Sequence, residues 1–494
     1  MVDFTFTMKT FMHACLACSC IAGSTFADPI QEQIDAMQQR IDTVETETDE
    51  MRTTLDIIRT DAEENWLSEE RTVQIRSIVH DVLSDADSRS NLVGDGLLGG
   101  WDEGFFIASS DGRFKLKVGG LLQERYVTNH RDAADRWRTG FENTRTRLNI
   151  SGHIFDKDTT FLVQPGFGWI DPYAFGSAFV NVPVTNIQPR LWDAWVKFKL
   201  SEEWSLKVGL FTLPFSRESL VSDQYQLAVD RSLLDYRIGL GRSQGIQFTW
   251  VRDEVRAFMA FTDGSMTLGS NDVVVNSNST SAAGALAEAN QIPPWSALMS
   301  GTKWSATARV EFLLEGDWNQ FNTFTSPTGS NNASMFGVAF HVQQGELEED
   351  PPFTSETDLG VTADLTMNFN GGTFFASGTF HNQKNVENLL LGDTPNVDWF
   401  GYVFQGSIYT NAMTEVFMRM EGGGPKQELY GDDIQILTSG VNWYLDGQNL
   451  KITTDFGWSF AKISRQMRNQ MVGWRGSEGL EGEWLFRTQL QLLF

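Results

Sequence analysis

The sequence predicts an all-β transmembrane barrel of about 16 antiparallel strands, preceded by an α-helical coiled-coil segment. Three observations predict this fold. Apolar and polar residues alternate with period two in many segments after residue 111. Short turns and long loops alternate between those segments, and a heptad pattern of apolar residues precedes them. Period two puts one strand face in lipid and the other in the interior, so its repetition is typical of a barrel that spans a membrane.

The N-terminus is typical of an export signal. A short basic start at Lys9 is followed by an apolar run over residues 11–23. That run is shorter than the roughly 20 residues that a membrane-spanning helix needs. Small residues precede a plausible cleavage point after Ala27, so residues 1–27 are interpreted as a signal peptide. The alternative is a buried N-terminal helix.

Residues 28–62 are expected to form a periplasmic coiled coil. Apolar residues recur in alternating steps of four and three from Ile30 to Ile58, interrupted only by Thr48. Such a seam needs partner helices, and its mixture of Ile, Leu and Met permits a trimer. The alternative is a helix folded back on its own chain. Residues 63–100 are expected to hold a second helix and a glycine-rich hinge.

Residues 101–494 are expected to form the barrel. The connections after even-numbered strands are mostly short, with 315–332 as the exception, and those after odd-numbered strands are mostly long. This one-sided arrangement is typical of outer-membrane barrels. The alternative for the same alternation is a soluble β-sandwich. The sixteen predicted strands lie near 113–127, 142–155, 158–169, 190–200, 203–211, 244–251, 254–261, 303–314, 333–344, 357–369, 372–383, 398–410, 413–422, 433–445, 449–460 and 481–494.

Composition argues against several classes of function. The chain has 38 basic and 64 acidic residues and a formal net charge of −26. Nucleic acid is therefore an unexpected partner, because phosphate neutralisation needs a basic face. All three cysteines lie at positions 15, 18 and 20, so the rest of the chain has no disulfide scaffold and no thiolate metal site. The histidines lack metal-ligand spacing. We expect no metal, no cofactor and no enzymatic activity.

A barrel of sixteen strands encloses more volume than side chains can fill, so its interior is expected to hold water and act as a channel. A basic lumen would favour anions, whereas acidic loops such as 346–350 would repel them. The candidate pore-lining residues are the polar positions of the first five strands: Lys115, Lys117, Arg125, Arg145, Arg147, Asp193, Lys197, Lys199 and Lys207.

Residues 212–243, between the fifth and sixth strands, are a candidate constriction. This loop is long and too apolar to float in water, so it is expected to fold inward against the barrel wall. Four arginines could then project into the pore: Arg217, Arg231, Arg237 and Arg242. The alternative is an outer cap, in which these arginines pair with the carboxylates of the loop: Glu218, Asp223, Asp230 and Asp235.

Residues 209–218 (GLFTLPFSRE) and 230–233 (DRSL) resemble the phosphate-selective porin O and P family, and 143–147 (NTRTR) and 440–444 (GVNWY) are similar to it too. The resemblance covers roughly 100–494. It implies a sixteen-stranded, trimeric outer-membrane channel with an inward-folded third loop. Phosphate-specific members use arginine and lysine clusters, but the resemblance assigns no phosphate ligand to a residue here.

Two functions follow as hypotheses. The first is an outer-membrane porin of a Gram-negative-type cell, through which small hydrophilic or anionic solutes diffuse passively. It would be a homotrimer in outer-membrane lipid, with its coiled coil in the periplasm. The second is a structural anchor that tethers the envelope through this stalk, with a periplasmic envelope component as its partner.

Overall fold

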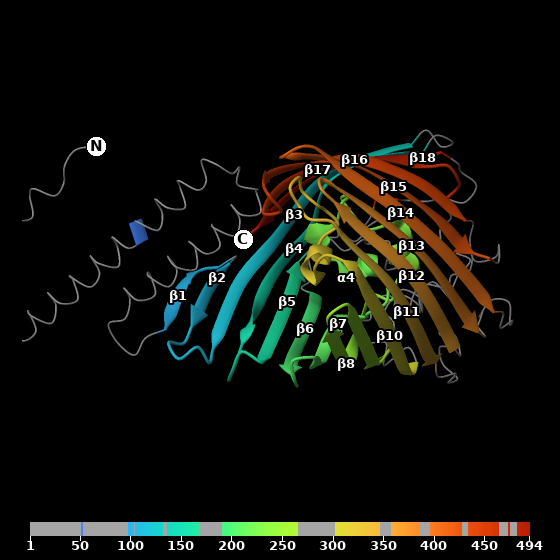
Figure 1. Cartoon of the computed structure of the whole chain (residues 1–494). Helices are drawn as coiled ribbons and strands as arrows, with labels where there is room; N and C mark the ends of the chain where they lie inside the picture. The colour runs from blue at the N-terminus through green and yellow to red at the C-terminus, as the bar shows by residue number, and fades with distance from the viewer. Residues whose placement is uncertain are drawn as a thin grey trace, which may run out of the picture. The chain divides into compact units, whose positions relative to one another are not determined.

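The computed structural model describes residues 51–52, 97–102, 104–131, 136–167, 190–264, 302–345, 357–384, 396–426, 433–463, 473–474 and 482–494. The expected signal peptide, all of the expected coiled coil except Met51 and Arg52, and the second helix lie outside these residues. The chain divides into two units, Met1–Arg76 and Ser77–Phe494. The described part of the second unit is a β-barrel (Figure 1).

Sixteen antiparallel strands, β3 to β18, close the barrel. Each pairs with the strand before and after it, β9 pairs with β10, and β18 returns to pair with β3. The predicted barrel of sixteen strands is confirmed, and every observed strand overlaps the segment predicted for it. Their bounds are β3 (Lys115–Arg131), β4 (Arg136–His153), β5 (Thr159–Phe167), β6 (Arg190–Lys199), β7 (Trp204–Thr212), β8 (Arg242–Arg252), β9 (Val255–Thr262), β10 (Thr302–Glu315), β11 (Ala333–Gly345), β12 (Thr357–Phe369), β13 (Gly372–Lys384), β14 (Val397–Asn411), β15 (Thr414–Pro425), β16 (Ile434–Asp446), β17 (Leu450–Ser459) and β18 (Glu483–Leu493).

A short hairpin that the sequence did not predict precedes the barrel. It consists of β1 (Leu98–Trp101) and β2 (Phe105–Ala108), and β2 pairs with the first residues of β3. Residues 98–100 were expected to belong to the hinge because residues 91–100 are rich in glycine. The pattern did not indicate the strands, because four residues are too few to reveal an alternation. Further along the same edge of β3, Gly120 and Phe494 exchange two backbone hydrogen bonds of 2.6 and 3.1 Å. The hairpin and the C-terminus therefore share this edge.

Burial alternates along the strands. On β11, Phe336 and Phe340 point outward and are exposed, whereas Met335 and His341 point inward and are fully buried. The same alternation runs through β12 to β18. The outer wall is thus apolar and the inner wall largely polar, as a barrel in lipid requires. Among the described residues there is no helix with both the length and the apolar character that crossing a bilayer would need.

One connection at the short-turn end of the barrel is unlike the others. A tight turn at Asn370 and Gly371 joins β12 to β13, and Gly371 adopts a φ of 84° that glycine allows without strain. The connection between β10 and β11, residues 316–332, instead contains a 3-10 helix, η4 (Trp318–Asn322). Asp317 begins that helix in a reciprocal capping box with Gln320.

Candidate functional site: the barrel interior

The connection between β7 and β8, residues 213–241, lies inside the barrel and is called the inner loop below (Figure 1). Two serines fix its helical turns. The Ser216 side chain accepts a hydrogen bond from Ser219 N at 3.4 Å, and the Ser232 side chain accepts one from Asp235 N at 3.0 Å. Both serve as N-caps. The elements of the inner loop are α4 (Arg217–Leu220), η2 (Asp223–Tyr225) and α5 (Leu233–Ile238).

The inner loop reaches strands on the far side of the barrel from β7 and β8. Leu234 N donates to Glu421 Oε2 on β15 at 3.2 Å, and Asn442 Nδ2 on β16 donates to Leu227 O at 2.9 Å. Val229 N also donates to a carboxylate oxygen of Asp455 on β17, at 3.1 Å. The loop therefore crosses the lumen.

Apolar packing fixes the inner loop on that wall. Leu227 and Leu233 of the loop belong to one buried cluster with Phe375, Trp399 and Phe417 of the wall, all at most 5% exposed. Burying one such side chain contributes about 1.5–3 kcal/mol. The loop and the barrel wall thus share a buried apolar cluster, and burial in this cluster favours the inward fold of so apolar a segment.

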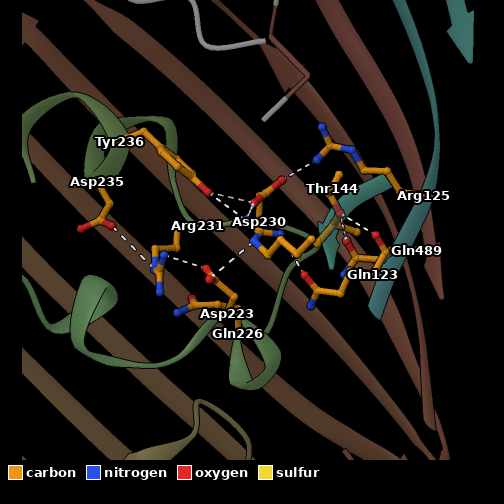
Figure 2. Close-up of polar contacts among 12 residues, drawn as sticks. Gln123, Arg125, Thr144, Asp223, Gln226, Asp230, Arg231, Asp235, Tyr236 and Gln489 are labelled. Carbon is orange, nitrogen blue, oxygen red and sulfur yellow. Dashed lines mark hydrogen bonds and ion pairs between the residues drawn. The ribbon is translucent and has the colours of Figure 1, made fainter. Parts of the chain in front are cut away.

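Asp230 is the centre of a charged cluster on the other side of the loop. Its carboxylate accepts a hydrogen bond from Arg125 Nη1 at 2.5 Å and one from Arg145 Nη2, and Tyr236 Oη lies 3.1 Å from it (Figure 2). Arg487 Nη1 lies 3.9 Å away. Three arginines of the wall thus converge on one carboxylate of the loop, and this holds β3, β4 and β18 against it.

Asp223 forms a second such centre near the tip of the loop. Arg147 Nη1 lies 2.5 Å from its carboxylate and Arg231 Nη1 lies 2.7 Å from it, with Arg145 Nε at 3.5 Å. Burial alone would raise the pKa of the Asp223 carboxyl. The guanidinium groups of Arg147, Arg231 and Arg145 outweigh burial and hold that pKa well below its usual range. Asp223 therefore stays ionised and paired.

Glu218 of α4 is also buried, but its pKa is shifted in the direction opposite to that of Asp223. Its carboxylate accepts hydrogen bonds from Ser232 N and, at 2.6 Å, from Ser232 Oγ. Burial and the neighbouring Asp235 carboxylate raise the pKa of Glu218 to about 7, although Arg419 favours the charged form. The inner loop thus contains one carboxyl group that titrates near neutrality beside others that remain charged.

The arginines of the sequence prediction lie in this interface between loop and wall. Arg125, Arg145 and Arg147 are at most 7% exposed and end on the loop carboxylates described above. Arg242 Nη2 lies 3.0 Å from Asp193 Oδ2, so Asp193, the acidic residue among the pore-lining candidates, forms an ion pair with Arg242.

The other arginines of the loop are placed as follows. Arg217 Nη1 lies 4.0 Å from Glu311 Oε1, and Arg231 pairs with Asp223. The side chain of Arg237 lies outside the described part of the chain. The loop is therefore inside the barrel, and Arg231 pairs with one of the carboxylates that the alternative prediction named.

Two of the predicted lysines lie near the short-turn end and have acidic partners. Lys115 Nζ lies 2.7 Å from Asp102 Oδ2, and Lys199 Nζ lies 2.8 Å from Glu202 Oε1. Lys117, on the same face of β3 as Lys115, is half-buried. Ion pairing at this end reduces the charge that these lysines present to a solute.

Lys197 and Lys207 are placed differently. They are directly opposite each other on β6 and β7, and both are half-buried. Within the described ranges neither has a carboxylate within 4 Å, and Lys207 Nζ lies 5.2 Å from the centre of the Trp195 ring. Thr160 and Ser205 beside them are half-buried too. The inward face of β5–β7, called the lysine wall below, is thus less covered than the far wall.

Charged residues on the later strands were not among the candidate pore-lining residues. Arg309 forms a two-point ion pair with Asp364, with distances of 2.7 and 2.9 Å, and Arg487 forms one with Asp455, with distances of 2.8 and 2.6 Å. Arg309 also donates to Phe215 O at 2.8 Å, which ties the start of the inner loop to β10. All four charged residues stand at inward positions of strands in which polar and apolar residues alternate. That alternation could have identified them as lumen residues.

A small, partly open pocket lies between the inner loop and strands β13 and β14, and Glu218, Asp235 and Thr379 are among the residues that line it. Among the residues that the structure describes, no group of three or more His, Cys, Asp or Glu side chains is placed to hold a metal ion.

The chain was compared with curated proteins, with solved structures and with protein families. None of the curated proteins compared with this chain matches it. Among solved structures, the chain is similar to OmpT of Vibrio cholerae, with 9% identity, 77% of this chain and 98% of that chain covered, and a TM-score of 0.48. It is also similar to an anion-selective porin from Comamonas acidovorans, with 10% identity, 77% and 99% covered, and a TM-score of 0.47. It is similar to the outer-membrane channel DcaP of Acinetobacter baumannii as well, with 10% identity, 78% of this chain and 99% of that chain covered, and a TM-score of 0.48.

The family comparison concerns the part of the chain that contains the inner loop. Residues 135–297 match the family model described as phosphate-selective porin O and P. This segment includes β4 to β9 and the whole inner loop. The resemblance that the sequence motifs indicated is confirmed: over this third of its length, the chain resembles phosphate-selective porin O and P.

Proposed function

We propose that this protein is an outer-membrane porin through which small hydrophilic solutes diffuse passively. The observation that carries the proposal is a closed wall of sixteen strands with apolar side chains outside and polar side chains inside. The match of residues 135–297 to a porin family supports it. We also propose that three copies assemble through their stalks, with the coiled coils in the periplasm.

The path for solutes follows from which wall the inner loop leaves uncovered. Most of the loop packs on β13–β18 and pairs with arginines of β3 and β4. Its two ends pack in a second cluster with Phe211 of β7, Ala260 of β9 and Ala339 of β11, and Trp195 of β6 lies against that cluster. The lysine wall keeps half-buried polar side chains, so solutes are expected to pass between it and the loop. Lys197 and Lys207 would give this passage a positive potential, which favours anions such as carboxylates and phosphates.

The channel itself is tested by reconstitution. Purified protein added to a planar lipid bilayer should produce stepwise increases in conductance. A salt gradient across the same bilayer then gives the reversal potential, whose sign reports whether anions or cations pass more easily. A folded protein that inserts without any conductance steps would contradict the proposed function.

The lysine wall predicts a change of ion selectivity. Replacing Lys197 or Lys207 by Glu should shift the reversal potential towards cations, because a side-chain charge acts on ions that pass within about a Debye length, roughly 8 Å, of it. Lys199→Glu is the matched control, since Lys199 lies on the same strand, is exposed and already pairs with Glu202. Equal reversal potentials in the wild type and both wall variants would refute this path.

A further inference from the structure

The tip of the inner loop reaches the short-turn end of the barrel. This tip is η2, Asp223–Tyr225. The carbonyl oxygen of Gln224 accepts hydrogen bonds from Lys451 Nζ of β17 at 3.0 Å and from Gln491 Nε2 of β18 at 3.3 Å. Lys451 is the second residue of its strand, and Gln491 is two residues from the end of β18. The loop therefore runs along the lumen almost to the end where the short turns are.

The connection between β10 and β11 meets the tip there. Phe324 N donates to Tyr225 O at 3.2 Å, and the Phe324 ring packs on Phe375 of β13 with 4.9 Å between ring centres. Thr373 Oγ1 donates to Phe324 O at 2.9 Å, which anchors Phe324 to the wall. Phe324 is 1% exposed and belongs to the same buried cluster as Leu227 of the loop. The connection thus contacts the tip of the loop on one side and the wall at β13 on the other.

We propose that the β10–β11 connection is a support for the inner loop, and that Phe324 is a positioning residue that sets the width of the passage. The loop lies between this support and the lysine wall, so any shift of the tip away from the lysine wall widens the passage. This inference rests on the proposed function, because Phe324 can set the width of the passage only if solutes pass there.

The chain offers a matched pair of substitutions. Phe321 lies in the same connection and is also 1% exposed, but it packs with Ala333 and Met335 rather than with the loop. Phe324→Ala and Phe321→Ala should therefore lower the midpoint of thermal unfolding by similar amounts, because each empties a fully buried site of an aromatic ring. Only Phe324→Ala removes a side chain from the buried cluster that the loop and the wall share, while the backbone hydrogen bond to Tyr225 O is kept.

The test is single-channel conductance in planar bilayers, with the full chain reconstituted and its folding checked by thermal unfolding in detergent. Phe324→Ala should raise the conductance and weaken the ion selectivity, because a wider passage keeps ions further from the lysines. Phe321→Ala should leave both at their wild-type values. If Phe324→Ala does not fold, Phe324→Leu replaces it, and a smaller rise in conductance is expected.

The outcomes separate this inference from the proposed function. A wild-type protein that never conducts would contradict the porin. A conducting wild type whose folded Phe324 variant keeps the same conductance would overturn the supporting role of the connection and leave the porin intact. Equal rises in conductance for the Phe324 and Phe321 variants would overturn it too, since general loosening would then explain both.

Discussion

Arg145 and Arg147 stand at inward positions of β4, yet both end on carboxylates of the inner loop. Their charge is therefore used to hold the loop rather than to face a solute. Lys197 and Lys207 lie on the same inner wall without such a partner among the described residues. Arginine suits the first use because its planar guanidinium can contact two carboxylates at once, and lysine suits the second as a compact point charge.

Because buried arginines hold the inner loop through its carboxylates, we predict that Asp230 is more important for stability than an exposed aspartate such as Asp253. In Asp230→Asn, the guanidiniums of Arg125 and Arg145 lose a buried counter-charge, which should destabilise the protein by about 3 kcal/mol. Thermal unfolding in detergent should show a lower midpoint. Asp253→Asn is the control, because Asp253 lies in a turn with its side chain 89% exposed and at a φ of 37°, which Asn tolerates. Equal midpoints in both variants would contradict the role of Asp230.

At the scale of the element, the strands and the inner loop differ in how far the sequence predicts them. The strand bounds follow closely from local alternation, since each strand carries its own pattern of lipid-facing and inward residues. The inward fold of the loop follows from its apolar composition. Its path across the lumen could not be predicted, because partners such as Trp399 and Phe417 lie on strands far along the chain. Asp223 and Asp230 were visible as charges, but their partners depended on that path.

The start of the inner loop depends on a glycine of β12. A Cβ atom at Gly360 would lie 2.6 Å from His381 Cε1 and 3.1 Å from Phe215 Cζ, so Phe215 packs into space that only glycine leaves. Gly360→Ala should displace Phe215 or His381 and cost about 1–3 kcal/mol by overpacking.

Thermal unfolding in detergent measures this cost, and bilayer recordings should show a noisier open channel as the loop loosens. Gly378→Ala is the matched control, since a Cβ atom at Gly378 on the adjacent strand β13 would meet nothing within 4 Å. A Gly360 variant as stable as this control would show that Phe215 has other room to pack.

At the scale of the whole molecule, closure of the barrel and filling of its lumen serve different purposes. Closure satisfies the backbone of every strand in lipid. The inner loop and the β10–β11 connection then lie within the space that closure creates, and in the function we propose they leave solutes a passage along the lysine wall. The sheet of the barrel closes within one chain. The trimer that we propose rests on the heptad pattern of residues 28–62.

Deleting residues 28–62 while retaining the signal sequence should therefore dissociate the trimer and leave each barrel conducting. Light scattering in mild detergent measures the mass of the assembly, and bilayer recordings should change from steps grouped in threes to single steps. A finer test replaces two seam residues, Ile34→Ser with Ile41→Ser, and compares them with Gln33→Ser and Gln39→Ser, which lie off the seam. Only the seam pair should weaken the trimer, because serine removes the apolar contact that a coiled coil buries. If the deletion keeps the trimer but releases the barrel from the rest of the envelope, the stalk is a tether and the structural role gains support.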